Sequence, residues 1–246
     1  MAASDHLDIR RCGWRTAPIV AVACALAVGL GSCAPEPIHE DIAAATPGGP
    51  ADFPADDYRR AAAAGHRVLR IDSEQSLIAV DVRRDGILAR LGHDHAVASH
   101  DLNGYVDLDE GRADLYLPLA RLAVDEPERR AEAGFSPQPD AAAIAGTRRN
   151  MLTRVLDAGR FPFARIAVRR DPADAATLQL AITLHGVTQP FVLPAQIEAQ
   201  PDGLTVTGAL SFRQSDFGIV PMSALNGALR VADRLDLRFR IVARPG

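Results

Sequence analysis

The chain has 246 residues, of which 24% are charged, and a formal net charge of −4 at pH 7. The sequence contains no lysine, so all of its 27 Lys and Arg residues are arginines. This excludes Schiff-base and Walker-type chemistry, which both need the lysine amine, and the net negative charge without a basic run argues against a nucleic-acid partner.

The N-terminal segment has the pattern of an export signal. Three arginines within residues 10–15 precede an uncharged stretch from Ala17 to Gly31, which is shorter than the roughly 20 apolar residues that a transmembrane helix needs. The sequence "LGSC" that ends at Cys33 resembles a bacterial lipobox. We therefore expect residues 1–32 to be a lipoprotein signal peptide and Cys33 to be acylated; a signal peptide with an incidental cysteine is the alternative.

Lipidation sets the expected location of the protein. The other two cysteines, Cys12 and Cys24, lie in the segment that would be removed, so the mature chain has to be stable without disulfides. Two or more acyl chains hold a protein durably on a bilayer. We expect an exported, membrane-anchored lipoprotein that faces the periplasm or the cell exterior.

Residues 33–65 are rich in Ala, Pro, Gly and acidic residues. Such a composition buries too little apolar area to offset the entropy of ordering. We expect a flexible tether, with a short helix around "YRRAAAAG" leading into a folded domain over residues 66–244.

From His66 onward, apolar and polar residues alternate. The clearest cases are "TLQLAITL" at 177–184 and "RLDLRFRI" at 234–241, which each have one apolar face, as in antiparallel sheets. Weaker alternation elsewhere gives about eight or nine short strands, enough to close a barrel that holds one small ligand. The residues predicted to line the lumen, or alternatively to serve in ordinary core packing, are Leu178, Leu180, Ile182, Leu184, Leu235, Leu237, Phe239 and Ile241.

A polar cluster interrupts the strand pattern. The stretch "GHDHAVASHD", residues 92–101, contains three histidines and two aspartates. An H-x-H pair on a strand places both imidazoles on one face, which suits Zn or Cu, so His93 and His95 are candidate metal ligands, with His100 or Asp101 as a further ligand. The alternatives are that His93, His95 and His100 recognise a ligand head group at the mouth of the barrel, or that they form a hydrogen-bonded turn.

One segment has helical periodicity. Asp140 is a candidate N-cap, apolar residues follow at helical spacing as far as Leu156, and Gly159 and Pro162 end the pattern. We expect one helix of about four turns, inserted between strands, that either covers a mouth of the barrel or packs outside the sheet.

Three motifs in register carry a family resemblance. The stretch "TLHGVTQPFVL" at 183–193 resembles the "LTIHGVTRPVTL" hallmark of the YceI-like family, "FRQSDFGI" at 212–219 resembles its "idR.dFGi" motif, and "NMLTRVLDAGRFPFARI" at 150–166 resembles its helix-to-strand segment. The resemblance covers residues 66–244. It implies a mainly β fold, an eight-stranded antiparallel lipocalin-like barrel with one inserted helix, whose apolar interior binds polyisoprenoid chains such as ubiquinone or polyprenyl phosphates.

The favoured function is a non-catalytic binding or carrier protein for an amphiphilic isoprenoid or related lipid, anchored to the membrane from which the ligand comes. A bound quinone or polyprenyl lipid is the one cofactor-like molecule expected, and no GxSxG or HExxH motif points to an enzyme. Two alternatives are a metal-binding envelope protein that uses the GHDH cluster and a structural envelope protein with a filled barrel. The resemblance also implies that some members are homodimers.

Overall fold

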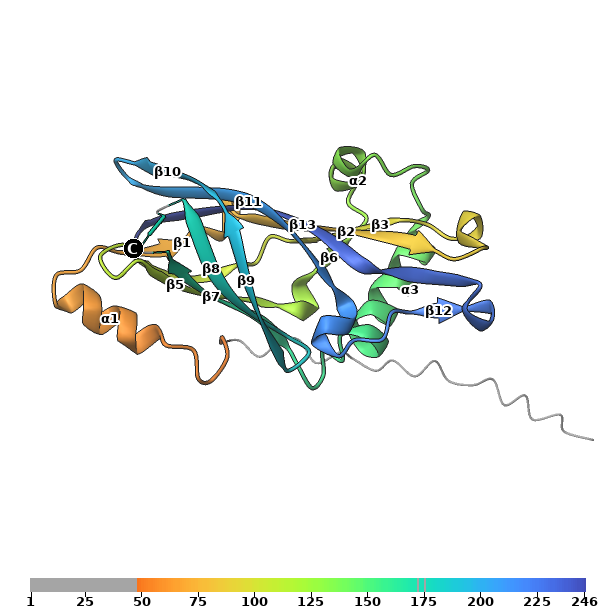
Figure 1. Cartoon of the computed structure of the whole chain (residues 1–246), viewed down its shortest axis with the longest axis horizontal. Helices are drawn as coiled ribbons and strands as arrows, with labels where there is room; N and C mark the ends of the chain where they lie inside the picture. The colour runs from red at the N-terminus through yellow and green to blue at the C-terminus, as the bar shows by residue number, and fades with distance from the viewer. Residues whose placement is uncertain (1–47, 172, 175) are drawn as a thin grey trace, which may run out of the picture. The chain divides into compact units, whose positions relative to one another are not determined.

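The protein is described here by a computed structural model that covers residues 48–171, 173–174 and 176–246 (Figure 1). The predicted signal peptide, Cys33 and the first part of the predicted tether lie outside these residues. The described residues belong to one compact unit. None of its helices is both long and apolar enough to cross a membrane.

Antiparallel strands form a single sheet of 13 strands, which confirms the expected mainly β fold. The strand order is β6-β3-β2-β13-β1-β4-β5-β7-β8-β9, with β11 paired to β13 and β10, and β12 paired to β13. The strands are β1 (Val68–Ile71), β2 (Leu77–Asp85), β3 (His95–Ser99), β4 (Asn103–Asp107), β5 (Arg112–Pro118), β6 (Ala123–Val124), β7 (Phe163–Arg170), β8 (Thr177–Leu184), β9 (Val187–Pro194), β10 (Gln196–Gln200), β11 (Gly203–Arg213), β12 (Ser223–Ala224) and β13 (Leu229–Pro245).

The sheet is divided differently from the eight-stranded closed barrel that the sequence predicts. The 3₁₀ turn Ser73–Gln75 separates β1 from β2, and Ala195 separates β9 from β10. A run of alternating residues therefore becomes two strands wherever such an interruption falls. Among the strands that the structure describes, no ladder joins β9 to β11, so the sheet is not closed.

Prolines account for the open edge of β9. His185 and Gly186, with φ of 52° and 76°, form the two-residue turn between β8 and β9, as in a type I′ hairpin. This turn fixes a register in which Pro190 and Pro194 occupy non-hydrogen-bonded positions opposite β8, where a backbone N–H would point away from β8. Proline lacks that donor, so β9 cannot continue the ladder at these positions.

Three α-helices are present in the described residues: the short helix expected before residue 66, the helix expected after Asp140, and one further inserted helix that the sequence did not predict. They are α1 (Ala55–Ala63), α2 (Pro127–Ala133) and α3 (Ala141–Asn150). The helix predicted after Asp140 is α3, whose first turn is capped by the Asp140 carboxylate accepting from the Ala143 N–H at 2.8 Å and which continues into a π-helical turn, Met151–Val155. The sequence of α2, "PERRAEA", is too short and too charged to show an apolar period.

Part of the predicted tether packs onto the sheet. Tyr58 of α1 is fully buried, donates a hydrogen bond to the Asp114 carboxylate at 2.7 Å and stacks on Tyr105. Phe53 meets Tyr116 edge-on, with 4.7 Å between ring centroids. The packed domain therefore begins near Phe53 and not at residue 66, because buried aromatic rings offset the ordering of an Ala-rich segment. The sheet, the helices and the core all lie within residues 48–246, as expected of an independently folding domain.

Candidate ligand-binding cavities

Two adjoining cavities occupy the interior that the curved sheet encloses. Cavity A, of about 350 Å³, lies at the end of the sheet that α3 covers. Cavity B, of about 580 Å³, reaches the opposite end, beside the turn between β4 and β5. The two cavities adjoin each other, because they share four apolar lining residues: Ile78, Ile166, Ile182 and Leu237.

Strand alternation supplies the apolar lining. On β8 and over residues 235–241 of β13 every second side chain faces the interior, while most residues between them, such as Gln179 and Arg238, are polar. The structure places all eight predicted lumen residues at the cavities. Leu184 and Leu235 line cavity A, Ile182 and Leu237 line both cavities, and Leu178, Leu180, Phe239 and Ile241 line cavity B.

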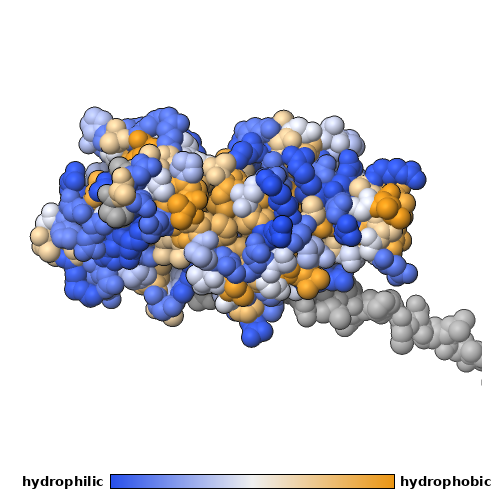
Figure 2. All heavy atoms as spheres, in the orientation of Figure 1, coloured by the Kyte–Doolittle hydropathy of each residue, from blue (hydrophilic) through white to orange (hydrophobic). Residues whose placement is uncertain are grey.

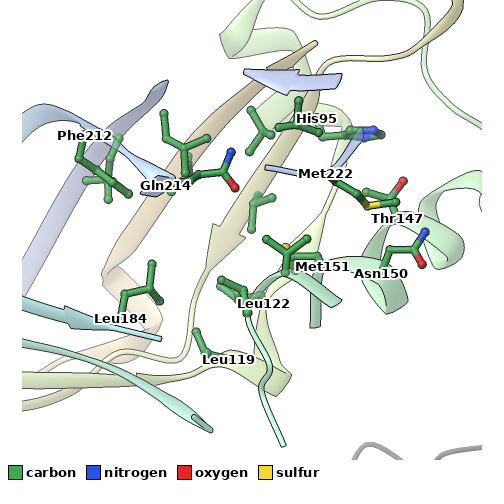
Figure 3. Close-up of a pocket in the computed structure, with 18 of the residues that line it drawn as sticks. His95, Leu119, Leu122, Thr147, Asn150, Met151, Leu184, Phe212, Gln214 and Met222 are labelled. Carbon is green, nitrogen blue, oxygen red and sulfur yellow. The ribbon is translucent and has the colours of Figure 1, made fainter. Parts of the chain in front are cut away.

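The helical segment covers one end of the interior. Thr147, Asn150 and Met151 line cavity A from α3 and its π-helical continuation, and Figure 3 shows them opposite Met222. The helix was predicted either to cover a mouth of the barrel or to pack outside the sheet. The structure places it over one end of the interior, at cavity A. Met side chains suit such a place because they are flexible and polarizable and adapt to ligands of irregular shape.

A buried charged network supports the polar side of cavity A. His95, the first residue of β3, lines the cavity and its Nδ1 lies 2.6 Å from the Asp125 carboxylate. That carboxylate also accepts from the Ala96 N–H at 3.0 Å and from the Arg130 guanidinium at 2.6 Å. Arg130 further donates to the Asp94 and Pro137 carbonyls. Because its Nδ1 is engaged by Asp125, His95 has Nε2 free for a ligand.

The pKa of Asp125 shows which effects dominate this network. Burial raises the pKa of the Asp125 carboxyl, but the hydrogen bonds from His95, Arg130 and the Ala96 N–H outweigh it, so the pKa lies below its usual range. The carboxylate is therefore charged at neutral pH and compensates the buried Arg130.

The three predicted histidines do not converge. His93 also lines cavity A, and its ring centroid is 6.4 Å from that of His95. His100 lies on the surface, where its Nε2 is 2.9 Å from Glu126, and Asp101 accepts from Asn103. His93 and His95 thus fit the head-group hypothesis better than the metal hypothesis, because no third candidate ligand among the described residues joins them.

A different group of three side chains lies close enough together to be considered as a metal site. His66, Asp107 and Glu110 have candidate ligand atoms within 4.8 Å of one another. The His66 Nδ1 lies 2.9 Å from the buried Asp107 carboxylate, and the Glu110 carboxylate pairs with the Arg112 Nε at 2.7 Å. Each member already has a protein partner, so the geometry is that of a structural hydrogen-bonded cluster.

Two residues that support the site, Asp125 and Arg130, have no clear signal in the sequence. Both lie in the charged stretch "VDEPERR", which predicts a solvent-exposed segment, and only the tertiary contacts bring them to His95. Gln214, which lines cavity A and donates to the Ala232 carbonyl at 2.8 Å, follows the alternation of β11. Extending the period-two pattern beyond Phe212 finds it.

Comparison with known proteins agrees with this architecture. A family model, the YceI-like domain, matches residues 70–243. The chain belongs to the YceI-like family. This YceI-like protein has no significant match among curated proteins.

Several solved structures are similar to this chain at low sequence identity, and the first of them has the same fold. A polyisoprenoid-binding domain from Saccharophagus degradans, implicated in plant cell wall breakdown, is 13% identical, with a TM-score of 0.51 over 72% of this chain and 98% of that chain. Burkholderia cenocepacia BcnA is 14% identical, with a TM-score of 0.47 over 70% of this chain and 98% of that one. A Campylobacter jejuni YceI protein is 12% identical, with a TM-score of 0.42 over 59% and 82% of the two chains.

Proposed function

We propose that this protein is a non-catalytic binding or carrier protein for an amphiphilic isoprenoid or related lipid. The observation that carries the proposal is the apolar interior, which holds two adjoining cavities that share four aliphatic lining residues. An elongated apolar chain matches such a space, because each buried methylene contributes roughly 0.8 kcal/mol. A structural protein with a filled interior would lack these cavities.

The polar head of the ligand would lie at cavity A. His95, with Nε2 free, and His93 face this cavity, and Arg84 and Arg230 also line it. Because the Nδ1–H of His95 donates to Asp125, the Nε2 of the neutral ring accepts a hydrogen bond, as from a quinol hydroxyl, and a phosphate would be attracted by arginine. The tail would extend past Ile182 into cavity B.

The expected eight-stranded lipocalin-like barrel belongs to the same proposal. The pairs β1 and β2, β3 and β4, β5 and β6, and β9 and β10 would each act as one interrupted long strand beside β7, β8, β11 and β13. This reading is supported by β10, which follows β9 after a single residue and pairs with β11. Leu193 of β9 also packs in one apolar cluster with Val206 and Leu210 of β11.

Attachment to the bacterial envelope rests on the sequence alone. The lipobox pattern supports acylation of Cys33 after export, with residues between the lipid and Phe53 as the tether. Metabolic labelling with a palmitate analogue tests this directly. Label that enters the wild-type chain and is absent from Cys33→Ser supports the anchor, and equal label in both contradicts it.

Native mass spectrometry tests the ligand. The chain from residue 34 onward, produced in a bacterial periplasm without the lipid, should carry a non-covalent isoprenoid mass that organic extraction removes. Ile182→Trp places a large ring where the two cavities meet and should abolish the adduct. Val192→Trp, at an exposed position of β9, is the matched control and should retain it.

A bare protein mass that persists after incubation with quinones and polyprenyl lipids would contradict the proposal. Equal ligand occupancy in Ile182→Trp and Val192→Trp would show that any bound lipid lies outside the two cavities.

A further inference from the structure

Exposed aliphatic side chains gather at one end of the domain. Ile87 is 88% exposed, and Leu91 and Leu225 are each 59% exposed. The segments that carry them are joined, because the Leu88 N–H donates to the Ala228 carbonyl at 2.8 Å. Figure 2 shows apolar surface at this end, where Figure 1 places β12 and the connection between β2 and β3. We call Ile87, Leu91 and Leu225 the apolar tip.

The apolar tip borders the mouth of cavity A. His93, Ser223 and Ala224 are exposed and also line cavity A, so the cavity reaches the surface among them. Leu91 lies two residues before His93, and Leu225 directly follows Ala224. A ligand that enters cavity A by this route passes the exposed aliphatic side chains.

The backbone of the tip is strained. Leu225 and Asn226 have φ of 52° and 53°, a left-handed conformation that is unfavourable for leucine because of its Cβ. Asparagine and glycine tolerate this conformation much better. A leucine that is strained and also exposed lowers the stability of the isolated domain, and such residues concentrate at functional sites.

The charge beside the tip is complementary to an anionic surface. Arg84 and Arg230 are paired with Asp94 and Asp85. Arg90, which is exposed and adjoins Leu91, has no ion-pair partner in the part of the chain that the structure describes. An unpaired arginine next to aliphatic side chains is the combination that attracts a protein to anionic lipid head groups and inserts apolar groups beneath them.

We infer that the apolar tip docks into the surface of an anionic lipid bilayer and thereby aligns the mouth of cavity A with the membrane. The inference rests on the proposed function, because it gives the route by which a lipid enters or leaves the interior without crossing water. Scattered single aliphatic residues on a surface need no explanation. Here three adjoin one cavity mouth together with a free cation and a strained leucine.

Vesicle flotation tests the docking surface. The chain from residue 34 onward, without the lipid anchor, is mixed with vesicles of phosphatidylglycerol and phosphatidylethanolamine, or of phosphatidylcholine alone. The wild type should float with the anionic vesicles, and Ile87→Asn/Leu225→Asn should reduce the bound fraction by about tenfold. Val192→Asn, an exposed aliphatic position on β9, is the control and should bind like the wild type. Because asparagine accepts the left-handed backbone at 225, the variant should melt no lower than the wild type.

Binding of geranyl diphosphate and of a two-isoprene quinone from solution, measured by calorimetry, separates the two proposals. Retained binding of either probe by the double variant, with loss of flotation, supports the docking surface. Equal flotation of the variant and the wild type, or failure of the wild type to float, overturns it. If neither probe binds to any form while flotation still depends on the tip, the proposed function fails and the docking surface stands.

Sedimentation velocity covers one further outcome. In this outcome the wild type forms a dimer that the double substitution disrupts, and it shows no binding to vesicles. That result would overturn the membrane proposal and assign the apolar tip to contact with a second copy of the chain.

Discussion

The Asp125 network allows a quantitative prediction. In Asp125→Asn, the replacement is nearly isosteric and tolerates the positive φ of 58° at this position, so the change removes one negative charge and turns one acceptor oxygen into an NH₂ donor. The Asp125 side chain is fully buried and that of Arg130 is 3% exposed. The substitution therefore leaves a buried guanidinium without its counter-ion.

The expected loss follows from these contacts. Removing one partner of a buried ion pair costs about 3 to 5 kcal/mol. Asparagine keeps one oxygen that can accept from the Ala96 N–H, and Arg130 keeps two carbonyl acceptors. We therefore expect the free energy of unfolding to fall by about 3 kcal/mol, a large share of the roughly 5 to 15 kcal/mol of a typical domain.

Urea unfolding followed by far-ultraviolet circular dichroism measures this loss. Asp85→Asn is the control, because Asp85 forms a surface pair with Arg230 at 2.8 Å in which both side chains are about half exposed, and such pairs contribute about 0 to 1 kcal/mol. Equal losses in Asp125→Asn and Asp85→Asn would refute the reasoning that burial makes the difference.

The pH dependence gives a second check on the same residue. The pKa of Asp125 is lower in the folded than in the unfolded chain, so its contribution to stability is present above the unfolded value of about 3.9 and is lost as the pH falls through the folded value. The difference between the wild type and Asp125→Asn should therefore shrink below about pH 4. A difference that grows on acidification would contradict the assigned charge.

Other predictions concern the hydrogen-bonded pair of His66 and Asp107, beside cavity B, and two glycines. The hydrogen bond to Asp107 raises the pKa of His66. The stability that His66→Ala removes should therefore be fully present below about pH 6 and disappear as the pH rises through the folded pKa. An equal difference between the melting temperatures of the wild type and His66→Ala at pH 5.5 and at pH 9 would contradict this. Gly104→Ala should lower the melting temperature markedly, because φ is 154° and a Cβ would lie 2.3 Å from the Asp114 carbonyl oxygen. Gly146→Ala in α3 meets no atom within 4 Å and should instead stabilise by about 1 kcal/mol, so a loss on calorimetric melting would show that α3 needs this glycine.

The sequence alone determined the class of fold, the family and the apolar face of two strands. Strict alternation in β8 and β13 reveals which side chains face the interior, because period two fixes the face of each residue once one face is charged. Asp140 marks the start of α3 for an equally local reason, since an N-cap acts on N–H groups of the next turn.

Only the tertiary structure decided how these elements combine. The open edge of β9 depends on the register set by a two-residue turn. This register places Pro190 and Pro194 at positions where a backbone N–H would point away from β8. The network of His95, Asp125 and Arg130 joins residues that are up to 35 positions apart, and no local pattern encodes such a contact. Packing of Tyr58 likewise made the short helix expected in the tether, α1, part of the folded domain. Local periodicity records which face of an element is buried, whereas the partner that buries it is set by contacts between distant parts of the chain.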